Sequence, residues 1–213
     1  MNWLTYLIPR TVYKTTSRFN KDIRVVEESG KFKLLVNGSR ESGPFIERLW
    51  GDALRMLHLT TVSRMKRILV LGVAGGTVMR LLRERYPHAA ITGVDIDDAM
   101  INIGKKYFGL NGMESFTCVV DDAKHYVSTY KGALFDCVVI DLFIGTDVPA
   151  FVQSQDFQKK IRHVMMPHGF TLINYAFSSG SKDRAADIHS ALKSLYPTVR
   201  RHDTVYNRFF LAK

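Results

Sequence analysis

Short unbroken apolar runs alternate along the chain with longer stretches in which apolar residues recur every three or four positions. The runs lie at residues 68–71, 90–95, 116–120, 135–140 and 170–175. Runs of this length predict strands that are buried on both faces of a sheet. The stretches between them predict helices. Strands that alternate with helices are typical of an α/β protein with a doubly wound, mostly parallel sheet.

The N-terminal part has a different pattern, which indicates a small antiparallel element. Residues 23–42 hold two apolar-rich stretches, and Ser29-Gly30 and Asn37-Gly38 have the composition of hairpin turns. After Gly43-Pro44, the apolar residues from Ile46 to Leu57 follow a helical stripe. We therefore expect a small β element and a helix ahead of the parallel sheet.

These patterns divide the chain into two parts. We expect residues 1–62 to form the hairpin element and its helix, and residues 63–213 to form a Rossmann-like domain. Within the second part, residues 151–165 predict a helix, and Pro167-His168-Gly169 predicts a turn. Two final apolar runs between residues 198 and 212 predict a closing antiparallel pair of strands.

A glycine-rich turn follows the first of the parallel strands. Glycine has no Cβ, so such a turn lets the backbone approach a ligand closely. The dinucleotide-binding pattern needs Gly at its first, third and sixth positions, which here hold Gly72, Ala74 and Thr77. The turn therefore suits a cofactor that has an adenosine but no pyrophosphate. S-adenosylmethionine (SAM), or its decarboxylated form, is the candidate.

Acidic residues end the neighbouring strands. Asp95 ends the second strand, where a carboxylate can accept hydrogen bonds from ribose hydroxyls. Asp122 and Asp141 follow the third and fourth strands. Ligands of open α/β sheets bind at the carboxyl edge of the strands. These acids and Gly72 therefore predict a single site at that edge.

Four short motifs at these strand ends carry a family resemblance. They are Gly72-Val73-Ala74-Gly75-Gly76-Thr77, Asp95-Ile96-Asp97, Asp121-Asp122-Ala123 and the run from Phe135 to Asp141. They resemble the G-G-G-D-G-G, E-I-D, G-D-G and F-D-V-I-I-x-D motifs of the spermidine synthase family. That family has the class I SAM-dependent methyltransferase fold. The resemblance runs from about residue 23 to the end of the chain, and it implies a homodimer.

The resemblance implies a role for each matched position. Asp95 would hold the ribose, Asp122 and Ala123 would contact the adenine, and the glycine turn would form the floor of the cofactor site. The cofactor-binding residues implied in this way are Gly72, Val73, Ala74, Gly75, Gly76, Asp95, Ile96, Asp121, Asp122, Ala123 and Asp141.

The chain departs from the family at the positions that hold the polyamine. The Asp of the family's glycine turn is Gly75 here, and the second acid of its D-x-x-D-P motif is Ile144. The family's Tyr-Gln-Glu on the preceding helix is replaced by Trp50-Gly51-Asp52. The groups that bind adenosine are thus retained, and those that bind a polyamine are largely lost.

This pattern favours methyl transfer over aminopropyl transfer. Methyl transfer needs alignment with an already activated sulfonium, whereas a diamine acceptor needs a second anchor. We therefore expect a SAM-dependent methyltransferase-like protein, with Asp141 as the catalytic base or acceptor-orienting carboxylate. A polyamine aminopropyltransferase that uses decarboxylated SAM is the alternative. A non-catalytic protein that binds a nucleoside or a partner is the third reading.

Weaker signals point to the acceptor, which we expect to be a small molecule. Asp147, in an Asp-Val-Pro sequence, could belong to a shifted substrate loop. Asn174 and Tyr175 end the fifth strand, where this fold often places substrate contacts.

Charge is distributed unevenly along the chain, whose net charge is +10. Residues 95–156 carry a net charge of −6, while residues 1–67, 68–94 and 157–213 carry +7, +2 and +7. This predicts a basic body around an acidic cofactor mouth. Nothing resembles a nucleic-acid-binding module, so a nucleic-acid partner is unsupported.

The remaining sequence features concern the location of the protein in the cell and metal binding. No apolar run reaches the ~20 residues of a membrane span, and we read no signal peptide, so we expect a cytoplasmic protein. The seven histidines show no helical pairing, and the two cysteines fall on distant strands. We therefore expect no metal site.

Overall fold

A small antiparallel sheet begins the described part of the chain. The structure is a computed structural model that describes residues 8–57, 65–145, 147–176 and 181–213. The strands of the small sheet, in spatial order, are β1 (Arg10–Thr15), β2 (Ile23–Glu28), β3 (Lys31–Val36) and β4 (Ser39–Ser42). Two-residue turns with positive φ, at Ser29-Gly30 and Asn37-Gly38, join β2 to β3 and β3 to β4. This confirms the predicted hairpins.

The strand β1 was not expected from the sequence. It pairs only with β2, and none of its side chains is buried. An edge strand of this kind lacks the apolar run that marks a central strand, so the hydrophobic pattern does not reveal it.

A seven-stranded sheet forms the body of the molecule. Its strands in spatial order are β10 (Val199–Asp203), β11 (Asn207–Ala212), β9 (Met165–Ala176), β8 (Phe135–Ile140), β5 (Arg67–Leu71), β6 (Ala90–Asp95) and β7 (Phe116–Val120). The five strands from β9 to β7 are parallel, and β11 and β10 are antiparallel. This confirms the predicted α/β class, the mostly parallel sheet and the closing antiparallel pair.

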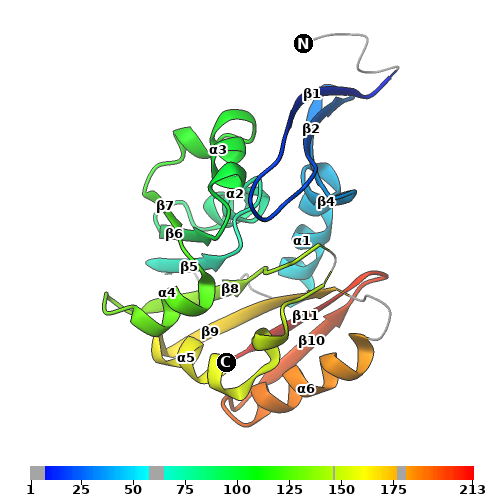
Figure 1. The fold of residues 1–213 in the computed structure, drawn as a ribbon. Coiled ribbons are helices and arrows are strands. Elements are labelled where there is room, and N and C mark those ends of the chain that lie inside the picture. Colours follow the sequence, from blue (N-terminus) through cyan, green and yellow to red (C-terminus); the bar gives the residue numbers. More distant parts are fainter. Residues whose placement is uncertain (1–7, 58–64, 146, 177–180) are drawn as a thin grey trace.

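Helices cover both faces of this sheet (Figure 1). They are α1 (Pro44–Met56), α2 (Thr77–Arg85), α3 (Asp98–Tyr107), α4 (Ala123–Thr129), α5 (Gln155–His163) and α6 (Ser181–Lys193), with short 3₁₀ turns η3 (Leu110–Gly112) and η4 (Ala150–Gln153). One face packs against α1 and α2, and the other packs against α4, α5 and α6. The helix α1, which we grouped with the N-terminal element, therefore packs on the large sheet.

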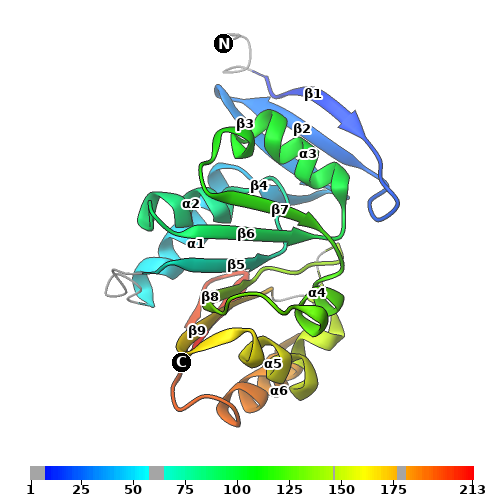
Figure 2. The same ribbon diagram turned by 90° about the vertical axis from the view of Figure 1, so that its left-hand side faces the viewer.

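The small sheet packs against α3 rather than against the large sheet (Figure 2). Ile23 and Leu34 of the small sheet share a core cluster with Met100 and Ile103 of α3. This arrangement brings the end of β4 close to the carboxyl edge of the large sheet. Ser42 there accepts a hydrogen bond from the glycine turn.

Two local predictions were wrong near the C-terminus. The expected helix over residues 151–165 is divided into η4 and α5, because the Ser154 side chain caps α5 by accepting a hydrogen bond from Phe157 N. Pro167-His168-Gly169 does not separate a helix from a strand. It lies within β9, where the pairing with β8 shifts between Met165 and Phe170. An irregularity of this kind accommodates a proline that cannot donate to the sheet.

Candidate functional site

The glycine turn at residues 72–76 comes very close to the end of β8. Gly72 has a φ of 94°, and a Cβ at this position would lie 2.1 Å from the main-chain oxygen of Asp141. Only glycine therefore fits between the two strand ends. A Cβ at Gly75 would lie 2.7 Å from the Ser42 side chain. This contact explains why the aspartate that the resemblance leads one to expect here is absent.

All five backbone N–H groups of this turn donate hydrogen bonds within the protein. The acceptors, in order from residue 72 to residue 76, are Val94 O (2.8 Å), Asp95 Oδ2 (2.9 Å), Asp95 Oδ2 (3.0 Å), Ser42 Oγ (2.9 Å) and Val73 O (2.8 Å). The turn therefore presents backbone at the site but offers no free N–H group to an anion.

Asp95 lies at the end of β6, beside the turn. Its Oδ2 accepts the two N–H groups of Val73 and Ala74, and its Oδ1 accepts Asp97 N at 2.9 Å. Burial raises the pKa of Asp95, and these three hydrogen bonds oppose that effect. Oδ1 receives one hydrogen bond and can accept another from a hydroxyl group. The next residue, Ile96, exposes 43% of its surface and offers an apolar face beside the carboxylate.

A cavity of about 310 Å³, here called the cofactor cleft, lies over these groups. Of the residues named from the sequence at this edge, Gly72, Ala74, Asp95, Ile96 and Asp141 line it, whereas Val73, Gly75 and Gly76 do not. The cleft also holds two residues of the small sheet's first loop that the sequence did not indicate. They are Phe19 and Asn20.

Asp97 attaches that loop to the large sheet. This residue is 2% exposed, and it accepts hydrogen bonds from Asn20 Nδ2 (2.7 Å) and Ser17 Oγ (2.5 Å). The loop therefore forms one wall of the cofactor cleft. The contact joins residues about 80 positions apart, so no local pattern signals it.

The Asp121-Asp122-Ala123 motif follows β7 and leads into α4, and it lies outside the lining of the cleft. Asp121 N donates to Asp95 O at 3.0 Å, which places the motif beside Asp95 at the sheet edge. The Asp122 side chain caps α4 by accepting His125 N at 2.9 Å, and Ala123 packs into the core. An adenine role for these residues stays a prediction.

A second cavity, of about 410 Å³, adjoins the cofactor cleft. We call it the acceptor cavity. Glu41, Asp141, Phe143 and Gly145 line both cavities, so the two spaces meet at these residues. Asp141 therefore stands at the boundary between them.

A hydrogen-bonded chain of two buried amides ends at the Asp141 carboxylate. Asn174 Nδ2 donates to Asp141 Oδ1 at 2.9 Å, and Asn207 Nδ2 donates to Asn174 Oδ1 at 2.9 Å. Burial raises the pKa of Asp141 to about 6, which the hydrogen bond from Asn174 and the nearby indole of Trp50 oppose. Trp50 Nε1 is buried, and within the described residues no acceptor meets hydrogen-bond geometry with it. The N–H group therefore influences the carboxylate without a formed hydrogen bond.

The structure separates the weaker acceptor candidates. Asn174 lines the acceptor cavity, but Tyr175 does not. Tyr175 is 1% exposed and packs in the core on the other face of the sheet, because successive strand residues point to opposite faces. The structure therefore does not bring Tyr175 to the acceptor cavity. Asp147 is exposed, forms a β-bridge with Ile144 and lines neither cavity.

Glu41 is the acid that the sequence reasoning missed. It lies on β4 and lines both cavities. Burial raises its pKa to about 8, and the charges of Asp141 and Asp95 add to the effect. Glu41 lies 100 residues before Asp141 and shares no sequence motif with it. Its place just after the Asn37-Gly38 hairpin turn is the feature of the sequence that could have indicated it. The acceptor cavity thus holds a carboxyl group beside that of Asp141 that the sequence did not predict.

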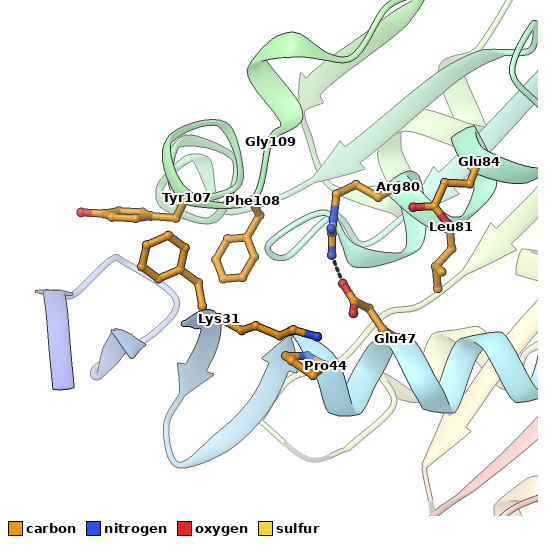
Figure 3. A pocket seen from close by; sticks show the side chains of 11 residues that line it. Lys31, Pro44, Glu47, Arg80, Leu81, Glu84, Tyr107, Phe108 and Gly109 are labelled. Atoms are coloured by element: carbon orange, nitrogen blue, oxygen red, sulfur yellow. Dashed lines mark hydrogen bonds and ion pairs between the residues drawn. The ribbon is translucent and has the colours of Figure 1, made fainter. Parts of the chain in front are cut away.

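A larger cavity of about 600 Å³ lies elsewhere, among α1, α2, α3 and the small sheet (Figure 3). Arg80 and Glu47 form an ion pair in it, and Tyr107 and Phe108 lie at one side. The Phe32 ring packs edge-on against both of these rings. None of the residues predicted for the site lines this cavity, so we do not assign the site to it.

The described part of the chain contains neither a metal-binding cluster nor a membrane-spanning helix. In the described ranges, no group of three or more His, Cys, Asp and Glu side chains is arranged to hold a metal ion. The helices of those same ranges are all too short or too polar to cross a bilayer.

Comparisons with known proteins agree with this architecture. Residues 68–169 match a family described as "Methyltransferase domain". A polyamine aminopropyltransferase of Aeropyrum pernix is 26% identical over 208 residues, covering 93% of this chain and 64% of that protein. A Drosophila melanogaster homologue of the eEF1A lysine and N-terminal methyltransferase is 31% identical over 129 residues, or 54% of this chain and 19% of that protein.

A solved structure supports the fold over nearly the whole chain. The crystal structure of a probable spermidine synthase from Corynebacterium glutamicum has a TM-score of 0.82 and 17% identity, covering 96% of this chain and 80% of that one. The sheet, its helices and this likeness define the class as the class I SAM-dependent methyltransferase fold. Within that class, the chain is similar to this probable spermidine synthase and to the polyamine aminopropyltransferase of Aeropyrum pernix. It spans about two thirds of the length of the Aeropyrum pernix relative.

Proposed function

We propose that this protein is a SAM-dependent methyltransferase that transfers the sulfonium methyl group to an acceptor in the acceptor cavity. The observation that carries the proposal is the position of Asp141, which lines both the cofactor cleft and the acceptor cavity. A carboxylate at this boundary can accept a hydrogen bond from the attacking atom and orient it for in-line attack. The methyltransferase-domain match and the methyltransferase relatives also support methyl transfer.

The residues of the cleft fit the adenosine and sulfonium parts of SAM. Asp95 Oδ1 has capacity for a ribose hydroxyl, and exposed Ile96 offers an apolar surface to the adenine. The carboxyl groups of Asp95, Asp97 and Asp141 make the cleft a favourable environment for a positive sulfonium. When bound, SAM supplies a methyl group that is already activated for attack.

Asp141 would accept a proton or a hydrogen bond from the acceptor. Because its pKa is about 6, the carboxyl group is mostly ionised at neutral pH and can accept a proton or a hydrogen bond. Asn174 holds its Oδ1, which leaves Oδ2 for the acceptor. The role of Asp141 is therefore to orient and deprotonate the acceptor.

A second candidate function is aminopropyl transfer from decarboxylated SAM. No Lys, Arg or His lines the cofactor cleft in the described part of the chain, and the turn N–H groups already have acceptors. The α-carboxylate of SAM therefore finds no partner there, whereas decarboxylated SAM has none to place. The same acidic cleft suits its amine.

Calorimetric titration decides between these functions. SAM, S-adenosylhomocysteine, decarboxylated SAM and methylthioadenosine are titrated into the wild type and into Asp95→Ala, with exposed Asp98→Ala as the matched control. We expect SAM and S-adenosylhomocysteine to bind, with affinity at least ~10-fold weaker in Asp95→Ala and unchanged in Asp98→Ala. Preference for decarboxylated SAM would instead establish the second candidate. If nothing binds, a non-catalytic, partner-binding role becomes the leading account.

A further inference from the structure

The acceptor cavity has a polar floor, an aromatic wall and an open rim. Asn174, Asn207 and Trp50 are between 1% and 7% exposed and define the deep end, together with Asp141 and Glu41. At the other end, Tyr206 is 62% exposed and Arg40 is also exposed. A ligand that fills this cavity therefore contacts acids and amides at its inner end and Arg40 at its outer end.

The floor suits one positive charge. Glu41 and Asp141 both line this end of the cavity, and the charge of Asp141 acts on Glu41. The pKa values of about 8 for Glu41 and about 6 for Asp141 leave one carboxyl group protonated and one ionised at neutral pH. The buried Trp50 N–H and the Asn174 amide also favour this single negative charge.

The wall between floor and rim is aromatic. Phe45, Trp50, Phe143 and Tyr206 line it, and the rings of Phe45 and Tyr206 lie 6.4 Å apart. Such a surface favours an apolar or aromatic ligand body over a bare polymethylene chain carrying several charges.

Arg40 places a positive charge at the rim. Its guanidinium lies over the Phe45 ring at 5.5 Å, and within the described residues it has no carboxylate partner at salt-bridge distance. A second ammonium group at this end would be repelled, whereas a carboxylate would be attracted.

We infer that the acceptor is a monoamine with an apolar or aromatic body, and that Arg40 excludes diamines from the cavity. The amine lies between Glu41 and Asp141, and the far end of the molecule is neutral or carries a carboxylate. This inference rests on the proposed function only in taking the second cavity as the place of the acceptor.

Three rigid probes of matched length test this inference in the cofactor-free protein. They are 4-methylbenzylamine, 4-(aminomethyl)benzoate and 1,4-bis(aminomethyl)benzene, whose far ends are neutral, negative and positive. Their dissociation constants are measured by NMR titration at low salt. We expect the diamine to bind about 5- to 10-fold more weakly than 4-methylbenzylamine, and the benzoate at least as tightly.

Variants of Arg40 show whether its charge causes the difference in affinity between the probes. In Arg40→Met the three dissociation constants should agree within about twofold, and Arg40→Lys should restore the order. Arg48→Met, an exposed arginine outside the cavity lining, is the control and should keep the wild-type order. Equal or tighter binding of the diamine, an unchanged order in Arg40→Met, or binding of none of the probes would overturn the inference. Because no cofactor is present, these outcomes are independent of the SAM titration.

Discussion

Glu41 is an acid that the fold keeps largely protonated at neutral pH. Its pKa is about 8, against an ordinary value of 4.5, because burial and the carboxylates of Asp141 and Asp95 all disfavour its ionised form. A buried acid of this kind lowers the stability of the folded protein at every pH at which the same carboxyl group is ionised in the unfolded chain. Such a cost is typical of groups that are placed for binding or catalysis rather than for stability.

Glu41→Gln should therefore raise stability in a pH-dependent way. Between pH 4.5 and 8 the folded wild type binds more protons than the unfolded chain, so its free energy of unfolding falls as the pH rises through this window. Gln does not titrate. We expect the variant to match the wild type near pH 4.5 and to be about 2–4 kcal/mol more stable above pH 8. Urea unfolding across this range measures the difference.

Exposed Glu114→Gln is the matched control for that series. Its difference from the wild type should stay within about 0.5 kcal/mol at every pH. A constant gap between Glu41→Gln and the wild type would contradict the assigned pKa, because only a titrating group gives a gap that grows with pH.

Among the elements, the loop between β1 and β2 depends on one side chain of the large domain. Asp97 accepts hydrogen bonds from Ser17 and Asn20 of this loop, and it also caps α3 by accepting Ala99 N at 3.1 Å. One buried carboxylate thus fixes both the start of a helix and a wall of the cofactor cleft.

Asp97→Ala should lower the free energy of unfolding by about 2–3 kcal/mol, because it removes a helix cap and leaves two loop donors unpaired. The exposed neighbour Asp98→Ala loses only a favourable charge in the first turn, and its cost should be under ~1 kcal/mol. Chemical denaturation of both variants measures the contrast. Equal costs would mean that the hydrogen bonds to the loop contribute nothing to stability.

The same elements show what a sequence can reveal about this fold. Asp95 and Asp141 were predicted because each directly follows an apolar run, and parallel strands end at one edge. Asn174 and Tyr175 point to opposite faces of the sheet. The sequence did not predict which of them faces the acceptor cavity, because that depends on the register of β9. Glu41 and Asn20 were missed because tertiary packing alone brings the small sheet over that edge. Local patterns therefore located the cofactor side of the site better than the acceptor side.

Over the whole molecule, the most deeply buried strands lie at the centre of the large sheet. The strands β5 and β8 have neighbours on both sides, and the side chains from Ile68 to Leu71 and from Val138 to Ile140 are fully buried. The strand β7 forms the edge of the same sheet, and none of its side chains is buried.

Native-state hydrogen exchange should follow this gradient. We expect the amides of β5 and β8 to exchange only through global unfolding, while the amides of β7 and β1 exchange through local opening at lower free energy. NMR or mass spectrometry of exchanged peptides gives the order. Protection of β7 equal to that of β5 would show that the molecule opens as one unit.

The amide chain that runs from Asn207 through Asn174 to Asp141 has a consequence for how the protein is made. A ribosome releases the chain from its N-terminus, so Glu41 and the glycine turn emerge long before the last strand. The Asp141 carboxylate obtains its full set of partners only when residue 207 has left the exit tunnel. An incomplete nascent chain therefore cannot hold the carboxylate as the finished protein does, and the site matures with the final strand.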